Sequence, residues 1–191
     1  MSAAKVEQEL DRLAALARAC KVLAPQLDRL GTRYADTLRA GGTLYFCGNG
    51  GSAADAQHLA TEYVVRYAVS RRALAAVALT TDTSILTAAG NDLGFEQIFS
   101  RQVEALCRSG DLLVLHSTSG RSPNLLEAAR AARRLKVPTV AFLGRGGGPL
   151  ADEVDESVVV PSDDTSQIQV LHLALEHLVV ELVESALVGV G

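Results

Sequence analysis

From residue 43 onward, short apolar runs alternate with segments of helical composition, and this alternation restricts the possible folds most strongly. The apolar runs are residues 43–47, 75–79, 112–116, 139–143 and 157–160. The helical segments are residues 53–67, 82–89, 95–107, 122–136, 147–153 and, at the end, 165–187. Short apolar strands between helices are typical of a parallel sheet covered on both faces. We therefore predict an α/β fold, a three-layer doubly wound sandwich of the flavodoxin type with a five-stranded parallel sheet.

Two further helices are predicted before the first strand. Apolar side chains recur at helical spacing over residues 2–19 and over residues 25–40. Gly41 and Gly42 follow the second segment and are predicted to stop its helix. Both segments lie outside the alternation, so we expect an N-terminal helical hairpin that covers one face or joins a subunit interface. The 191 residues are predicted to form a single domain, with helices over 1–41 and the α/β core over 42–191.

Charge and composition argue against several classes of partner. The net charge is −4 without a basic block, and aromatic residues make up only 4%, which is unlike a nucleic-acid-binding protein. No apolar run approaches the roughly 20 residues that cross a bilayer, and the N-terminus does not resemble a signal peptide. Three widely spaced cysteines form no disulfide framework, as expected in a reducing compartment. We therefore predict a cytoplasmic protein without nucleic acid or membrane partners.

The first strand leads into a glycine-rich turn, residues 48–52, that opens the next helix. Glycine lets the backbone turn sharply and present its N–H groups, and Ser52 is predicted to cap the helix. A loop of this kind at a helix N-terminus is a ready site for phosphate. In the same helix His58 and Glu62 lie four residues apart and therefore share one face. The stretch predicts chemistry on a phosphorylated small molecule.

A second polar loop follows the third strand. Its hydroxyl groups come from Ser117, Thr118, Ser119 and Ser122. Hydroxyls at the start of a helix can bind the oxygens of a phosphate or a sugar, and ligands of doubly wound sheets lie at the carboxyl ends of strands. In the closing helix, Gln169 and His177 are eight residues apart, a little over two turns, so they can face one side.

These segments resemble the sugar isomerase (SIS) domain family, and within it the phosphoheptose isomerases. The resemblance covers about residues 40–187 through the motifs GNGGSAADAQH, ALTTDTSILTAAGND, FSRQVEAL, GDLLVLHSTSG and DTSQIQVLHLALEH. Several motifs in one order are far more specific than a single glycine pattern. The resemblance implies a homotetramer whose sites lie at subunit interfaces.

The resemblance also implies roles for individual residues. Sugar-phosphate contacts fall on Asn49, Gly50, Gly51, Ser52, Asn91, Asp92, Ser117, Thr118, Ser119, Ser122 and Gln169. Zinc is implied as a cofactor, with ligands from one or more subunits at His58, Glu62, Gln169 and His177. Glu62 would act as base and His177 as acid in an aldose–ketose isomerisation through an enediol. The implied reaction converts sedoheptulose 7-phosphate to D-glycero-D-manno-heptose 7-phosphate.

Three positions depart from the family pattern. Val170 stands where a Glu usually follows the glutamine, Gln167 where an Arg is common, and His116 where an aliphatic or small residue usually precedes STSG. These departures leave the implied metal ligands intact and concern the fit of the substrate.

Two other functions are considered. A branch of the same family is not catalytic and binds the bacterial replication initiator, but it does not keep both acid–base residues, so Glu62 and His177 favour the enzyme. A dinucleotide-binding module is suggested by the loose GxGxxA pattern over residues 48–53. Such a module has an acidic residue at the end of the strand that follows the glycine pattern. Here the next predicted strand, residues 75–79, ends at Leu79 instead.

Overall fold

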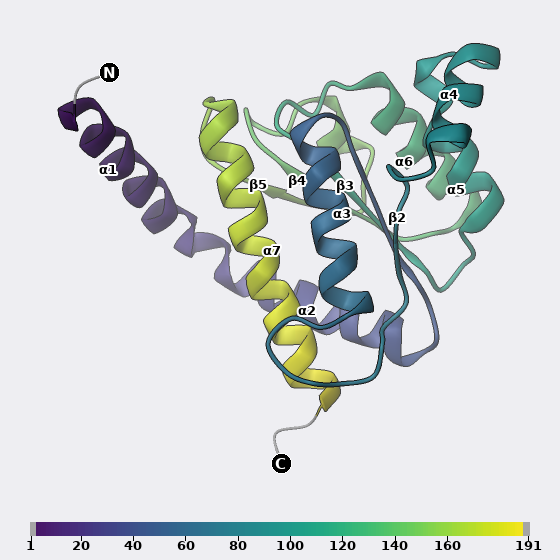
Figure 1. Cartoon of the computed structure of the whole chain (residues 1–191), viewed down its shortest axis with the longest axis horizontal. Coiled ribbons are helices and arrows are strands. Elements are labelled where there is room, and N and C mark those ends of the chain that lie inside the picture. The colour runs from purple at the N-terminus through teal and green to yellow at the C-terminus, as the bar shows by residue number, and fades with distance from the viewer. Residues whose placement is uncertain (1–2, 189–191) are drawn as a thin grey trace.

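The computed structural model describes residues 3–188, and at its centre lies a five-stranded parallel sheet in the order β2-β1-β3-β4-β5 (Figure 1). The strands are β1 (Leu44–Gly48), β2 (Ala76–Ala78), β3 (Leu112–Ser117), β4 (Thr139–Leu143) and β5 (Glu156–Val159). Each neighbouring pair is parallel. The predicted sheet is confirmed, with β2 shorter than expected.

Helices cover both faces of this sheet. One face carries α2 (Ala24–Arg39), α3 (Gly51–Val64) and α7 (Thr165–Val188). The other carries α4 (Thr83–Asp92), α5 (Ser100–Leu106) and α6 (Pro123–Leu135), with the 3-10 turns η2 (Phe95–Gln97) and η3 (Pro149–Asp152). The three-layer arrangement predicted from the alternation is confirmed.

Successive side chains of a strand enter opposite cores. In β1, Leu44 and Phe46 pack with α2, α3 and α7, whereas Tyr45 and Cys47 pack with the helices of the other face. Side chains of a strand alternate between the two faces of a sheet. Because both faces are covered, every position of β1 is buried, which explains the unbroken apolar run in the sequence.

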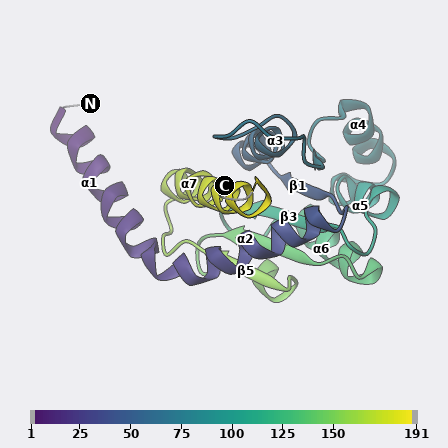
Figure 2. The same cartoon turned by 90° about the horizontal axis from the view of Figure 1, so that it is seen from below.

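The N-terminal helices do not form the predicted hairpin. The helix α1 (Ala3–Ala19) passes through the 3-10 turn η1 (Cys20–Leu23) directly into α2, and α1 projects away from the rest of the molecule (Figures 1 and 2). Pro25 lies in the first turn of α2, where proline is tolerated, so it does not break the helical path. No residue of α1 is buried in this single chain.

Several predicted helices have different bounds, and the segment predicted over 95–107 is divided into η2 and α5. The segment predicted over 147–153 is only the short turn η3, because Gly146, Gly147 and Gly148 all have positive φ angles and interrupt helical geometry. The segment predicted over 82–89 extends to Asp92, and the Asp82 side chain caps it by accepting a hydrogen bond from the Ile85 N–H over 2.9 Å.

The order of the strands creates a switch point between β1 and β3. From β1 the chain runs through α3 to the edge strand β2, and it then returns to β3 on the other side of β1. The helix after β1 covers one face of the sheet and the helix after β3, α6, covers the other. Loops that follow β1 and β3 therefore leave adjacent strands at one edge, where ligands bind in folds of this type. Within residues 3–188, no helix has the length and apolar character required to span a bilayer.

Candidate active site

Two helices of the same sheet face, α3 and α7, lie side by side and run in the same direction (Figure 1). Their register follows from three contacts along the pair: Gly51 with Gln169, His58 with His177, and Tyr67, just past the end of α3, with Glu184. Residues of a helix that are three, four, seven or eight apart lie near one face. One side of α3 therefore faces one side of α7 over several turns.

The middle contact brings three possible metal ligands together. His58 Nε2 lies 2.9 Å from His177 Nε2 and 3.2 Å from Glu62 Oε1. One ligand atom from each of the three residues falls within 4.8 Å of the other two. In a tetrahedral site with zinc bonds of about 2.0–2.1 Å, neighbouring ligand atoms lie roughly 3.3 Å apart. The two spacings from His58 Nε2 are close to this value, and we call these three residues the His–Glu–His cluster.

The cluster is partly sheltered from solvent. The side chains of His58 and Glu62 are 46% and 17% exposed. Burial, together with the neighbouring His58, lowers the pKa of His177, and Glu62 offsets part of this effect. Two imidazole nitrogens that face each other at hydrogen-bond distance require either one shared proton or one shared cation. The arrangement can thus transfer protons and can bind a metal ion.

The glycine-rich loop differs in one detail from the prediction. The helix begins at Gly51, after Gly50 with a φ of 57°, and Ser52 is its second residue, so the prediction that Ser52 caps the helix is wrong. The positive φ of Gly50 turns the chain before Ser52 is reached. No side chain caps the first turn of α3, which leaves N–H groups there for an anion.

Gln169 lies against this loop and not in the His–Glu–His cluster. A Cβ atom at Gly51 would lie 1.8 Å from Gln169 Nε2, so the Gln169 amide takes this position only because residue 51 has no side chain. Gln169 also lies beside Asp55, whose pKa is raised by burial and lowered in part by His116 and Gln169. Eight residues correspond to about 12 Å along a helix, which separates Gln169 from His177 within one chain.

The second polar loop meets the glycine-rich loop through two asparagines. Asn49 Nδ2 donates to Asn124 Oδ1 over 2.9 Å, and Asn124 Nδ2 donates back to Asn49 Oδ1 over 2.8 Å. Asn124 was not predicted as a site residue, and only its position next to the hydroxyl-rich loop could have indicated it. This pair joins the N-terminal regions of α3 and α6, as expected for two loops at one edge.

The hydroxyl groups of the second loop are arranged around its own turn. Ser117 Oγ accepts a hydrogen bond from the Gly120 N–H over 3.0 Å, and Ser119 Oγ accepts one from the Arg121 N–H over 3.4 Å. Ser122 stands at the N-cap of α6 without a side-chain cap, and Thr118 is half-buried. The loop therefore presents hydroxyls and a helix N-terminus beside the glycine-rich loop.

Comparison with known proteins shows which family this chain belongs to. The SIS domain family matches residues 10–144. The phosphoheptose isomerase of Akkermansia muciniphila is 52% identical over 172 residues, which cover 90% of this chain and 91% of that protein. A solved structure of the phosphoheptose isomerase from Neisseria gonorrhoeae is 39% identical with a TM-score of 0.89, and the match covers 95% of this chain and 97% of that one. This chain belongs to the SIS domain family.

A further relative is the phosphoheptose isomerase 1 of Campylobacter jejuni, which is 46% identical over 95% of this chain and 97% of its own length. The resemblance to phosphoheptose isomerases that the motifs predicted is confirmed, and so is the enzyme class. The replication-initiator-binding alternative is not favoured by these relatives.

Asn91 and Asp92 are not brought to the cluster within this SIS domain chain. They lie in the last turn of α4, are exposed, and bond to each other, with Asn91 Nδ2 donating to Asp92 Oδ1 over 2.6 Å. Figures 1 and 2 both place α4 on the opposite side of α3 from α7. Their role in substrate binding stays a prediction.

A buried pair beneath the site was missed from the sequence. His116 Nε2 lies 2.7 Å from Glu176 Oε2, and the two side chains are 0% and 2% exposed. The His116 ring stacks between Phe46 and Phe142. Burial opposes the charged imidazole, but the charge and hydrogen bond of Glu176 outweigh it and raise the pKa of His116. Glu176 immediately precedes His177, so the pair connects the sheet to the active-site face of α7.

Proposed function

We propose that this SIS domain protein is a phosphoheptose isomerase that converts sedoheptulose 7-phosphate to D-glycero-D-manno-heptose 7-phosphate. The observation that carries the proposal is the convergence of His58, Glu62 and His177 on one point of the sheet face that also carries the glycine-rich loop. The high identity to phosphoheptose isomerases over nine-tenths of the chain supports the same substrate. A cytoplasmic location is part of the proposal, because the three cysteines are buried free thiols.

Zinc fits the His–Glu–His cluster by ligand chemistry and by spacing. His58, Glu62 and His177 would hold the ion, and Gln169 would join them only from a position other than the one it takes beside Gly51. A bound zinc ion supplies a Lewis acid that polarises the substrate carbonyl.

The side chains of the cluster can carry the proton transfers. Glu62 removes a proton from C1 of the ketose and returns it to C2. His177 donates a proton to O2 and accepts one from O1 through Nδ1, because its Nε2 faces His58 in the cluster and would be the ligand atom. The carboxylate of Glu62 has two oxygens, and because Oε1 faces His58 at 3.2 Å, we assign the base to the other. Each such group contributes roughly 10²–10⁴-fold to the rate.

The test of this proposal is direct. The purified protein is incubated with sedoheptulose 7-phosphate, and formation of the aldose phosphate is followed by NMR. We expect turnover that is lost with a chelator such as EDTA and restored by added zinc. Absence of product from the zinc-loaded protein would rule out the proposed substrate, and full turnover of the metal-depleted protein would rule out the cofactor.

Replacing Ser119 by alanine should raise KM for the sugar phosphate with little change in kcat. Ser119 lies in the hydroxyl-rich loop that we assign to the phosphate, and a hydrogen bond to a charged group is worth about 1.5–3 kcal/mol, or roughly 10- to 100-fold in KM. Steady-state kinetics would measure the change, with Ser185→Ala on the exposed side of α7 as a control. If KM stays unchanged in alanine variants at 52, 117, 119 and 122, the phosphate binds elsewhere.

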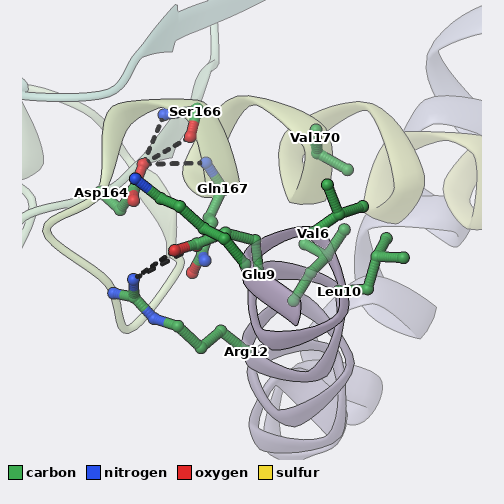
Figure 3. Close-up of a pocket in the computed structure, with 10 residues that line it drawn as sticks. Val6, Glu9, Leu10, Arg12, Asp164, Ser166, Gln167 and Val170 are labelled. Carbon is green, nitrogen blue, oxygen red and sulfur yellow. Dashed lines mark hydrogen bonds and ion pairs between the residues drawn. The ribbon is translucent and has the colours of Figure 1, made fainter. Parts of the chain in front are cut away.

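We propose that the active form is a homotetramer in which α1 is covered by another copy of the chain. Val6 and Leu10 of α1 are 48% and 61% exposed in the single chain, and Val170 of α7 is 51% exposed. These apolar side chains line a groove of about 530 Å³ between α1 and the start of α7 (Figure 3). An exposed apolar groove of this kind is typical of an interaction site.

Light scattering should therefore give a mass of about 80 kDa for four copies of this 20.1 kDa chain. Leu10→Glu should reduce the mass, because it places a charge in the apolar groove, whereas Glu7→Gln on the same exposed helix should not. A monodisperse species of single-chain mass in the unaltered protein would contradict the tetramer.

A further inference from the structure

A buried ion pair lies just beyond the end of α3. Arg71 Nε donates to Glu184 Oε1 over 2.8 Å, and both side chains are only 4% exposed. The other nitrogens of Arg71 donate to backbone carbonyls of the last turn of α3, to Glu62 over 2.6 Å and to Tyr63 over 2.8 Å. A cation at a helix C-terminus satisfies carbonyls that have no partner within the helix. Arg71 therefore fixes the turn that carries Glu62.

Glu184 fixes a second segment at the same place. Its two carboxylate oxygens accept hydrogen bonds from the backbone N–H groups of Tyr67, Ala68 and Val69 over 3.0, 2.9 and 3.2 Å. Burial opposes the charged carboxylate, but these donors and Arg71 outweigh it and lower the pKa of Glu184. Among the residues that the structure describes, residues 66–73 make no backbone–backbone hydrogen bond, so Glu184 and Arg71 are what order this segment.

The ordered segment places an aromatic ring on the active-site histidine. The Tyr67 ring stacks on His177 with centroids 5.4 Å apart and an interplanar angle of 25°. His177 also meets His58 edge-on, with ring centroids 5.1 Å apart and the two Nε2 atoms 2.9 Å apart. Tyr67 therefore covers a face of the His177 imidazole while its Nε2 edge meets His58, and both contacts restrict rotation of the ring.

We propose that Arg71 and Glu184 form a clamp that holds Tyr67 on His177 and thereby orients the His177 ring for the His–Glu–His cluster. Arg71, Glu184 and Tyr67 are positioning residues: none of them is one of the possible ligands, and each acts through the backbone or ring of another residue. The inference rests on the proposed function, since it concerns the same cluster. Partners that orient a metal-binding histidine typically affect metal affinity or activity about 10- to 100-fold.

The test compares Tyr67→Ala, Tyr67→Phe and Glu184→Gln with a control, Glu153→Gln. The control weakens two ion pairs, with Arg130 and Arg133, on the far face of the sheet. Zinc affinity is measured by competition with a chelating dye, and kcat and KM are measured separately. We expect Tyr67→Ala and Glu184→Gln to weaken zinc binding about 10- to 100-fold. In both variants kcat should fall by a larger factor than the factor by which KM changes. Tyr67→Phe keeps the stacked ring and should retain zinc affinity within about threefold.

Two results would overturn the clamp. One is a Tyr67→Ala variant that binds zinc as tightly as the unaltered protein, and the other is an equal loss in Tyr67→Phe. If the unaltered protein binds no zinc, the proposed cofactor is ruled out, whereas the isomerase function is still judged by product formation. The clamp is then tested in the imidazole NMR spectrum. With only four histidines in the chain, the His177 signals should shift or broaden in Glu184→Gln and not in Glu153→Gln. Unchanged His177 signals in Glu184→Gln would also refute the clamp. If Glu184→Gln does not fold, the Tyr67 pair of variants still decides the question.

Discussion

Replacing Glu62 by glutamine should lower kcat at least about 100-fold, the usual consequence of losing a general base. The amide has the same shape as the carboxylate and keeps an oxygen toward His58, so helix α3 and the cluster should retain their geometry. Glu62 lies on the partly exposed side of α3, and its side chain takes no part in the hydrophobic core. Folding and assembly should therefore persist, as judged by circular dichroism and light scattering.

The matched control is Glu127→Gln on α6, which removes a surface carboxylate paired with Arg130. This change should leave kcat unaltered. Near-normal turnover of Glu62→Gln would show that the base has been assigned wrongly. His177→Ala should lose turnover and zinc binding together, because it removes both a ligand atom and the acid.

Removing His116 alone should destabilise the protein by about 3–5 kcal/mol, the usual cost of leaving one member of a buried ion pair without its partner. In His116→Leu, Glu176 would remain buried between α7 and the sheet without its partner His116. Its Oε1 already has no hydrogen-bond partner. Urea unfolding would measure the loss of free energy of unfolding.

The double variant His116→Leu/Glu176→Leu separates the pair from the packing around it. Replacing a buried ion pair by apolar residues is often neutral or stabilising, so the double variant should recover most of the stability. If His116→Leu is as stable as the unaltered protein, the pair contributes no net interaction. If the double variant is less stable than His116→Leu, the packing around the pair and not its charge is what matters.

The stability conferred by His116 should depend on pH with a defined sign. Glu176, with a smaller contribution from Asp55, raises the pKa of His116 above its ordinary value of 6.5 despite burial, and His172 is the other titrating group beside it. The folded state therefore keeps this proton at a pH where the unfolded chain has lost it. The stabilisation is complete below about 6.5 and is lost as the pH rises through the raised pKa. The free energy of unfolding of the unaltered protein should fall more steeply above pH 6.5 than that of the double variant.

The sequence by itself determined the sheet, the layers and the two loops, because these depend on local patterns. An apolar run of five residues between polar turns predicts a buried strand at any position in a chain. A glycine-rich turn before a helix predicts an anion site. The pairing of His58 with Glu62 follows from helical spacing alone. The family motifs then supplied the activity and the likeness to phosphoheptose isomerases, which the relatives confirm.

The tertiary structure decided what depends on the register of separate elements. Spacing shows that Gln169 and His177 share a side of α7, but only the packing of α7 along α3 puts one at Gly51 and the other at His58. The pairs His116–Glu176 and Arg71–Glu184 join residues 60 and 113 positions apart. No local pattern indicates such partners, because a buried charge is recognisable only once the fold has enclosed it.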